Sequence, residues 1–275
     1  MNITIVGLGL IGGSIAKKLK DTDFNVFGID KNKLVLKKAL KEGIINKTDK
    51  DKLKIADLLI VCLYPKDTIE FIKKHKESLK KDVLITDVSG VKGDILKRVK
   101  NIIDKSQLFL PAHPMAGREE GGFDNSDKNL FVGANYLVMN KVKDKRYNLL
   151  KDVVKSLEAK FVEISIDRHD KMIGLTSQLP HIIASVVTRL NKFDDTKKFV
   201  GNSFDDVTRV SLINEDLWSE LFLSNKKELT KHLVNFKKEM DKVINLLQKD
   251  NKDILEKYLL ETRKQREDYL KKWKL

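Results

Sequence analysis

A glycine pattern directly behind the first apolar run constrains the fold of this chain more than any other feature. Residues 3–6 form an apolar run typical of a buried strand, and the sequence Gly-Leu-Gly-Leu-Ile-Gly at 7–12 follows it without a break. Gly7 permits a tight turn, and Gly12 lets the helix that begins here pack closely on the strand. The pattern therefore predicts a strand, a turn and a helix in succession, which is the first unit of an α/β fold.

The same pattern predicts a dinucleotide site. Gly9 has no Cβ to keep a pyrophosphate away, and the N–H groups of Leu10 and Ile11 open the helix with the positive end of its dipole. Asp30 ends the second apolar run and can accept both ribose hydroxyls. Its carboxylate would repel the 2′-phosphate of NADP, so NAD is favoured, although nearby lysines keep NADP possible. A glycine turn without a ligand is the alternative.

The first 164 residues alternate between short apolar runs and helix-like stretches. Uninterrupted apolar runs are typical of strands that are covered on both faces, as in a parallel sheet. The expected strands cover residues 3–6, 24–29, 58–63, 83–87, 108–110, 135–139 and 160–164. This alternation predicts a Rossmann-type, doubly wound α/β domain over residues 1–164.

Residues 165–275 have a different character, because strand-like runs stop and helical periods dominate. We expect an all-helical second domain there. One stretch carries apolar residues at alternating spacings of four and three: Leu229, Leu233, Phe236, Met240, Val243 and Leu247. This heptad-like seam suits either an ordinary bundle helix or a helix that packs against a second subunit.

Charge and cysteine content limit the classes of protein that fit. The chain of 275 residues has a net charge of +14, but its lysines are interleaved with acids and only 7% of residues are aromatic. A solvated basic surface is therefore favoured over a nucleic-acid site. No apolar segment approaches the length needed to span a membrane. The single cysteine, Cys62, cannot form an internal disulfide, which favours a cytoplasmic protein.

Two histidines have settings that suit a functional site. His113 follows the expected strand 108–110 and lies between Pro111 and Pro114, where open α/β sheets bind their ligands. An imidazole there suits proton transfer at neutral pH, although it could also merely bond the loop backbone. His181 follows Pro180, whose missing N–H predicts a kink in the helix.

Other polar side chains accompany His181 as candidates for the site. Ser177 precedes His181 by four residues and shares its helix face, although a core histidine bonded to a neighbouring helix is the alternative. Arg209 could clamp a carboxylate with two hydrogen bonds, or pair with Asp205 or Asp206 at the surface. No histidine–carboxylate cluster has the spacing of metal ligands, so no metal is expected.

The motifs, taken together and in order, resemble those of the prephenate dehydrogenase family, including its arogenate-using members. They are the glycine motif extended by Gly-Ser at 13–14, His-Pro-Met-Ala-Gly-Arg-Glu at 113–119, Ser-Gln-Leu-Pro-His at 177–181, and Thr-Arg-Val at 208–210 followed by Trp218. The resemblance covers nearly the whole chain. It implies NAD-dependent oxidative decarboxylation of prephenate to 4-hydroxyphenylpyruvate, in tyrosine biosynthesis.

The resemblance also implies roles for single residues. It makes His113 the base that bonds the ring hydroxyl of the substrate, and it makes His181 and Arg209 substrate ligands. It places Glu119 at the access to the site and Ser177 nearby. Arg118 is a further candidate because the substrate is a dianion. The helical half is expected to form a homodimer.

One segment departs from the family pattern. The family often has serine as the fourth residue of Asp-x-x-Ser-x-Lys, whereas Asp-Val-Ser-Gly-Val-Lys at 87–92 has Gly90 there and Ser89 one residue earlier. A backbone N–H or a water is therefore expected to hold the ring hydroxyl. Two other classes stay open: a hydroxy-acid or imine dehydrogenase of the same architecture, and a non-catalytic protein that binds NAD or a polynucleotide.

Overall fold

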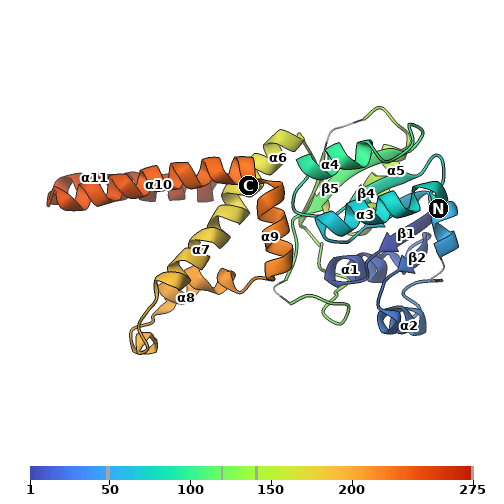
Figure 1. The fold of residues 1–275 in the computed structure, drawn as a ribbon, viewed down its shortest axis with the longest axis horizontal. Helices are drawn as coiled ribbons and strands as arrows, with labels where there is room; N and C mark the ends of the chain where they lie inside the picture. The colour runs from blue at the N-terminus through green and yellow to red at the C-terminus, as the bar shows by residue number, and fades with distance from the viewer. Residues whose placement is uncertain (48–49, 119, 140–141, 274–275) are drawn as a thin grey trace. The chain divides into compact units, whose positions relative to one another are not determined.

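The computed structural model describes residues 1–47, 50–118, 120–139 and 142–273. The first 164 residues form a seven-stranded sheet in the order β2-β1-β3-β4-β5-β6-β7 (Figure 1). The strands are β1 (Asn2–Val6), β2 (Asn25–Ile29), β3 (Leu58–Val61), β4 (Leu84–Asp87), β5 (Leu108–Pro114), β6 (Asn135–Met139) and β7 (Lys160–Ile164). The first five are parallel, β6 is antiparallel to β5, and β7 is parallel to β6.

Helices cover both faces of this sheet. Buried residues of α1 (Leu10–Leu19) and α5 (Arg146–Ser156) share one apolar cluster, and α2 (Lys33–Lys41) adds Ala39 to it. Buried residues of α3 (Pro65–His75) and α4 (Gly93–Lys100) belong to a second cluster. Every residue of β3 and β4 is buried, as expected of strands between two helical layers. The predicted doubly wound fold is confirmed.

From Ile166 onward the described chain contains helices and turns. These helices are α6 (Ile166–Ile173), α7 (Leu179–Leu190), α8 (Asn202–Thr208), α9 (Glu215–Ser224), α10 (Lys226–Gln248) and α11 (Lys252–Trp273). The predicted all-helical C-terminal part is thus confirmed as a fold class. No helix of the described residues is both long and apolar enough for a membrane span.

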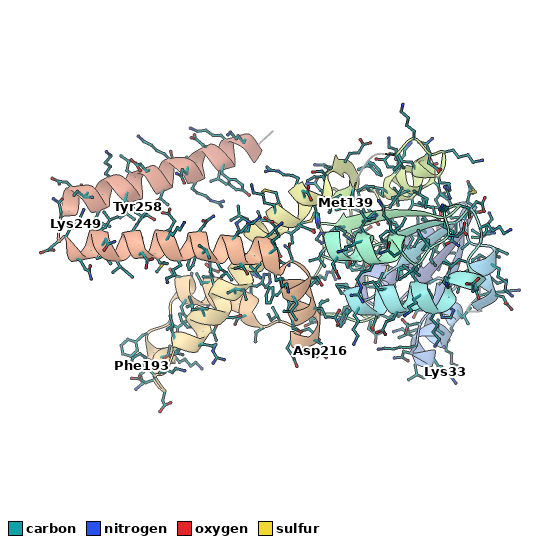
Figure 2. All side chains as sticks on the ribbon, turned by 45° about the horizontal axis from the view of Figure 1, so that its top comes forward. Lys33, Met139, Phe193, Asp216, Lys249 and Tyr258 are labelled. Atoms are coloured by element: carbon teal, nitrogen blue, oxygen red, sulfur yellow. The ribbon has the colours of Figure 1, made fainter. Side chains whose placement is uncertain are left out.

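Backbone contacts divide the chain into two compact units, Met1–Leu229 and Thr230–Leu275. The first unit therefore includes the sheet together with α6 to α9. The second contains most of α10, a turn near Lys249 and α11 (Figure 2). The division into domains 1–164 and 165–275 stays a prediction from the sequence.

Two local expectations differ from the structure. His113 lies inside β5, paired with Leu137 of β6, because the strand continues past residue 110 as an antiparallel partner of β6. Pro180 lies in the first turn of α7, and the carbonyl oxygen of Thr176 can receive no hydrogen bond from its nitrogen. The irregularity falls just before it, as a π-helical turn at Gly174–Gln178 between α6 and α7.

Candidate active site

The glycine motif forms a tight turn between β1 and α1. Gly7 has a φ of +86°, and a Cβ on it would lie 2.5 Å from the carbonyl oxygen of Cys62. A Cβ on Gly12 would lie 1.9 Å from the carbonyl oxygen of Gly7, so no side chain fits there. A Cβ on Gly9 would meet no protein atom within 4 Å. The protein itself thus requires glycine at 7 and 12, whereas the space at Gly9 is open to a ligand.

The residues around this turn fit a dinucleotide. Gly9 is the N-cap of α1, so Leu10 and Ile11 begin the helix with N–H groups that have no partner within it. Asp30 follows β2, which pairs with β1. Its carboxylate accepts hydrogen bonds from the backbone N–H groups of Leu8 and Asn32, both at 2.7 Å. Phosphate donors and a ribose acceptor therefore lie at one edge of the sheet.

A buried ion pair lies at the carboxyl end of β4. The Lys92 ammonium donates to Asp87 Oδ2 at 2.7 Å, and both side chains are fully buried. The Ser89 hydroxyl also donates to Asp87. Burial lowers the pKa of Lys92, and the neighbouring Asp87 carboxylate opposes that change. The hydroxyl of Ser89 is thus held within this cluster.

Gly90, next to that cluster, faces the candidate base. A Cβ built on Gly90 would lie 3.9 Å from Cε1 of His113 and 3.4 Å from a methyl group of Leu221. The position where the family often has serine therefore lies against the His113 ring. The hydroxyl of Ser89 donates to Asp87.

His113 lies on β5, near the carboxyl end of the parallel strands. The residue is half-buried. Burial is the largest cause that holds its pKa well below the usual range, followed by the positive charge of Lys92 and by His169. His113 is therefore neutral at neutral pH and able to accept a proton.

The structure brings two unpredicted residues to His113. Nδ1 of His113 lies 2.9 Å from Nε2 of His169, and Nδ1 of His169 lies 2.7 Å from Oδ1 of Asp170. Both belong to α6, and the His169 side chain is fully buried. Neither residue was predicted from the sequence. The available signal was a histidine followed directly by an aspartate in a short helix.

His181 lies on α7 against an aromatic ring. Its Nδ1 donates to the carbonyl oxygen of Ser177 at 2.8 Å. The ring stacks on Trp218 of α9, with 3.8 Å between centroids and 30° between the planes. The stack and the hydrogen bond together hold the imidazole in one orientation. Ser177 takes part through its carbonyl group.

Arg209 and Arg118, the two arginines expected to bind the substrate, lie in different surroundings. Arg209 is exposed at the start of a short 3₁₀ turn, Arg209–Ser211. Arg118 donates to Asp127 at 2.6 Å and lines a hollow of about 550 Å³ together with Lys17 of α1. The guanidinium of Arg118 thus has a carboxylate partner within the chain. Glu119 lies outside the described residues.

Comparison with known proteins identifies both halves of the chain. Residues 15–163 match the family model described as prephenate dehydrogenase, nucleotide-binding domain, and residues 165–261 match the model described as prephenate dehydrogenase, dimerization domain. A prephenate dehydrogenase of Lactococcus lactis is 32% identical over 96% of this chain and 76% of its own length. A cyclohexadienyl dehydrogenase of Zymomonas mobilis is 28% identical, over 96% and 94%.

Two solved structures share the fold over nearly the whole chain. Prephenate dehydrogenase from A. aeolicus, in complex with hydroxyphenyl propionate and NAD+, has a TM-score of 0.89 and 29% identity and covers 98% of both chains. Synechocystis arogenate dehydrogenase has a TM-score of 0.86 and 25% identity and covers 98% of this chain and all of its own.

Proposed function

The chain belongs to the prephenate dehydrogenase family, and from this premise we propose that it converts prephenate to 4-hydroxyphenylpyruvate with NAD as the oxidant. One observation carries the proposal: a neutral imidazole, His113, lies at the same edge of the sheet as the glycine turn. The relatives named as acting on prephenate or arogenate support this substrate class.

Proton transfer is the task we propose for His113. Prephenate carries a hydroxyl and a carboxylate on opposite carbons of a cyclohexadiene ring, and bound NAD supplies the acceptor for the hydride. His113 accepts the hydroxyl proton as the ring carbon is oxidised. Loss of carbon dioxide then makes the ring aromatic, and His113 returns the proton to the oxygen, so the reaction releases no net proton. A low pKa keeps the imidazole ready for the first of these transfers.

We propose that NAD binds through the glycine turn. The N–H groups of Leu10 and Ile11 would hold its phosphates, and Gly9 would allow their close approach. Asp30 would accept the ribose hydroxyls and repel a 2′-phosphate. The two backbone hydrogen bonds that Asp30 accepts support this role, since they hold the carboxylate beside the turn.

Substrate binding is assigned to the helical residues that the family motif marks. His181 and Arg209 would bind prephenate, Arg209 through a carboxylate, with Ser177 nearby. The stack of His181 on Trp218 supports this assignment, because it fixes the ring without using its Nε2. Glu119 and Arg118 remain candidates for substrate access and substrate charge.

Replacing Arg209 with alanine is expected to raise the KM for prephenate. A charge-assisted hydrogen bond contributes about 1.5–3 kcal/mol, which corresponds to roughly a 10-fold to 150-fold higher KM. The change in kcat should be smaller, since the contact is made in the ground state as well. Steady-state kinetics would measure this, with Arg189→Ala on the exposed end of α7 as the control. An unchanged KM would remove Arg209 from the binding site.

The proposed reaction is tested by following the absorbance of reduced cofactor with four combinations of substrate and oxidant. Prephenate and arogenate are each paired with NAD and with NADP. We expect the highest kcat/KM for prephenate with NAD. A preference for arogenate would favour the second candidate function, arogenate dehydrogenase, which the likeness to the Synechocystis enzyme supports. No reduced cofactor from either substrate would reject the proposal.

We also propose a homodimer. The model that matches residues 165–261 is described as a dimerization domain, and the apolar seam of α10 leaves Met240 and Leu247 exposed at 44% and 60%. Light scattering is expected to give a mass twice that of the 31.6 kDa chain. Met240→Glu combined with Leu247→Glu should weaken the dimer, whereas Lys238→Glu on the same helix should not. A monomeric wild-type chain would contradict this proposal.

A further inference from the structure

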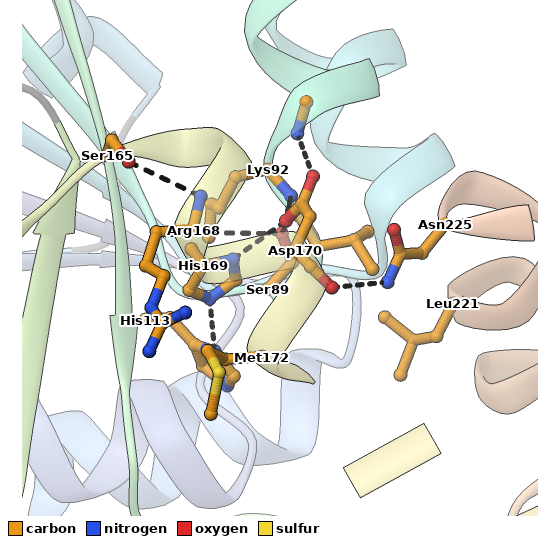
Figure 3. Close-up of polar contacts among 12 residues, drawn as sticks. Ser89, Lys92, His113, Ser165, Arg168, His169, Asp170, Met172, Leu221 and Asn225 are labelled. Atoms are coloured by element: carbon orange, nitrogen blue, oxygen red, sulfur yellow. Dashed lines mark hydrogen bonds and ion pairs between the residues drawn. The ribbon is translucent and has the colours of Figure 1, made fainter. Parts of the chain in front are cut away.

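Three side chains form a continuous hydrogen-bonded row behind the candidate base. The row runs from His113 through His169 to Asp170, with nitrogen–nitrogen and nitrogen–oxygen distances of 2.9 and 2.7 Å (Figure 3). His169 is fully buried between its two partners. Each of its ring nitrogens therefore has one neighbour in the row with which to share a hydrogen.

Two backbone N–H groups hold Asp170, the last residue of this row. Oδ1 of Asp170 accepts the N–H of Lys92 at 3.1 Å, and Oδ2 accepts the N–H of Gly93 at 2.8 Å. Lys92 is the N-cap of α4 and Gly93 is its first residue, so a negative charge is favoured there. A Cβ on Gly93 would lie 2.9 Å from Oδ2, so glycine is needed for this close approach.

A second set of bonds holds the backbone of the same residue. The side-chain amide of Asn225 donates to the carbonyl oxygen of Asp170 at 2.9 Å and to Oε1 of Gln178 at 2.8 Å. Gln178 in turn donates to the carbonyl oxygen of Leu221 at 3.0 Å. Asn225 and Gln178 are both buried. Asp170 is thus fixed from α4 on its side chain and from α9 and the π-helical turn on its backbone.

The donor and acceptor roles along the row follow from the Asp170 carboxylate at its end. An aspartate carboxylate only accepts, so Nδ1 of His169 carries a hydrogen and donates it to Asp170. In a neutral imidazole the other nitrogen then accepts, so Nε2 of His169 receives a hydrogen from Nδ1 of His113. By the same rule Nε2 of His113 carries a lone pair.

We propose that Asp170 and His169 are positioning residues that hold His113 in the tautomer with hydrogen on Nδ1, so that Nε2 takes the substrate proton. This inference rests on the proposed function, because it assigns the atom at which that reaction's proton is received. The row also serves the protonated state. Once Nε2 of His113 is protonated, the positive ring still donates to His169, with the Asp170 carboxylate behind it.

The charges that face the two histidines fit this role. Burial lowers the pKa of both rings, and the Lys92 ammonium lowers it further. The carboxylates of Asp170 and Asp87 raise the pKa of His169. Asp170 thus partly offsets the cost of a positive charge at a buried site that also holds a lysine.

Replacing Asp170 with asparagine tests the proposal in the full-length enzyme. The amide group cannot accept all three hydrogen bonds that the Asp170 carboxylate accepts. Where its NH2 group faces Nδ1 of His169 it donates there, which reverses every role in the row and places the hydrogen of His113 on Nε2. We expect kcat to fall by roughly 10²–10⁴-fold, the usual contribution of a positioned general base, while KM changes by less than about threefold. The acid limb of kcat/KM should move to lower pH, since a negative charge that favours the protonated rings is lost.

Asp167→Asn is the matched control, because Asp167 is an exposed aspartate in the first turn of the same helix. It should leave kcat and the pH profile unchanged. An active wild-type enzyme whose Asp170→Asn variant keeps its kcat and its pH profile would overturn the positioning role. The proposed function would survive that result.

The tautomer of His113 can be measured by NMR without any substrate. In 15N-histidine-labelled wild-type protein at pH 8, nitrogen shifts should show His113 with hydrogen on Nδ1 and a bare Nε2, and the signal is assigned by its loss in His113→Asn. A hydrogen on Nε2 instead would overturn the inference. This measurement holds even where Asp170→Asn folds poorly. Lack of turnover with prephenate and arogenate would overturn the proposed function alone.

Discussion

His113→Asn is expected to lower kcat by roughly 10²–10⁴-fold, the usual contribution of a positioned general base. Asparagine cannot take a proton at neutral pH, whereas the wild-type imidazole is kept neutral by burial and by the charge of Lys92. Because these causes lower the pKa of His113, the base form of the wild-type enzyme should persist as the pH falls below about 6.5. Steady-state kinetics over pH 5–9 would measure both effects.

The matched control for this variant is His75→Asn, at the end of α3. It should keep wild-type kinetics. The thermal midpoint of His113→Asn should stay within a few degrees of the wild-type value, so that lost turnover is not lost folding. Near-normal turnover by His113→Asn would remove this residue from the mechanism and leave the reaction without its proposed base.

Gly12→Ala is expected to destabilise the protein and abolish dinucleotide binding. Its Cβ would lie 1.9 Å from the backbone oxygen of Gly7, so the turn itself must move. Overpacking typically costs about 1–3 kcal/mol, and a contact this short with backbone should reach about 3 kcal/mol. For a chain of this length that corresponds to a drop in Tm of roughly 6 °C or more. Differential scanning fluorimetry with and without NAD would measure the loss of stability and of the NAD-induced shift.

Gly9→Ala separates the needs of the ligand from those of the fold. Its Cβ would meet no protein atom within 4 Å, so Tm should change by less than about 2 °C. The same methyl group would occupy the approach of the pyrophosphate, and we expect the KM for NAD to rise roughly tenfold, or about 1.4 kcal/mol. Unchanged NAD binding by Gly9→Ala would mean that the phosphates lie elsewhere.

Most strands were predictable because their signals are local. The expected runs 135–139 and 160–164 coincide with β6 and β7, and the run 24–29 differs from β2 by one residue. The run 108–110 was too short. Pro111 and Pro114 argue against a continuing strand, and only the distant strand β6 supplies the pairing that extends β5 through His113.

The glycine turn was predictable from local signals, whereas the row of His113, His169 and Asp170 was not. Gly7, Gly9 and Gly12 act within one strand–turn–helix unit, so their spacing alone predicted the turn and the ligand that it suits. His113 and His169 are separated by 56 positions, and no pattern in either segment refers to the other. The resemblance to a family pointed to His113 and said nothing of its partner.

By itself, the sequence determined the α/β order of the first half, the helical second half and the dinucleotide turn, because periodicity and glycine spacing act over a few neighbouring residues. Only the tertiary structure decided which groups surround His113. The packing of α6 beside α4 brings Asp170 to the start of α4 and His169 to β5. Such contacts depend on how whole elements pack, and a hydrogen bond forms only where that packing brings donor and acceptor within about 3 Å.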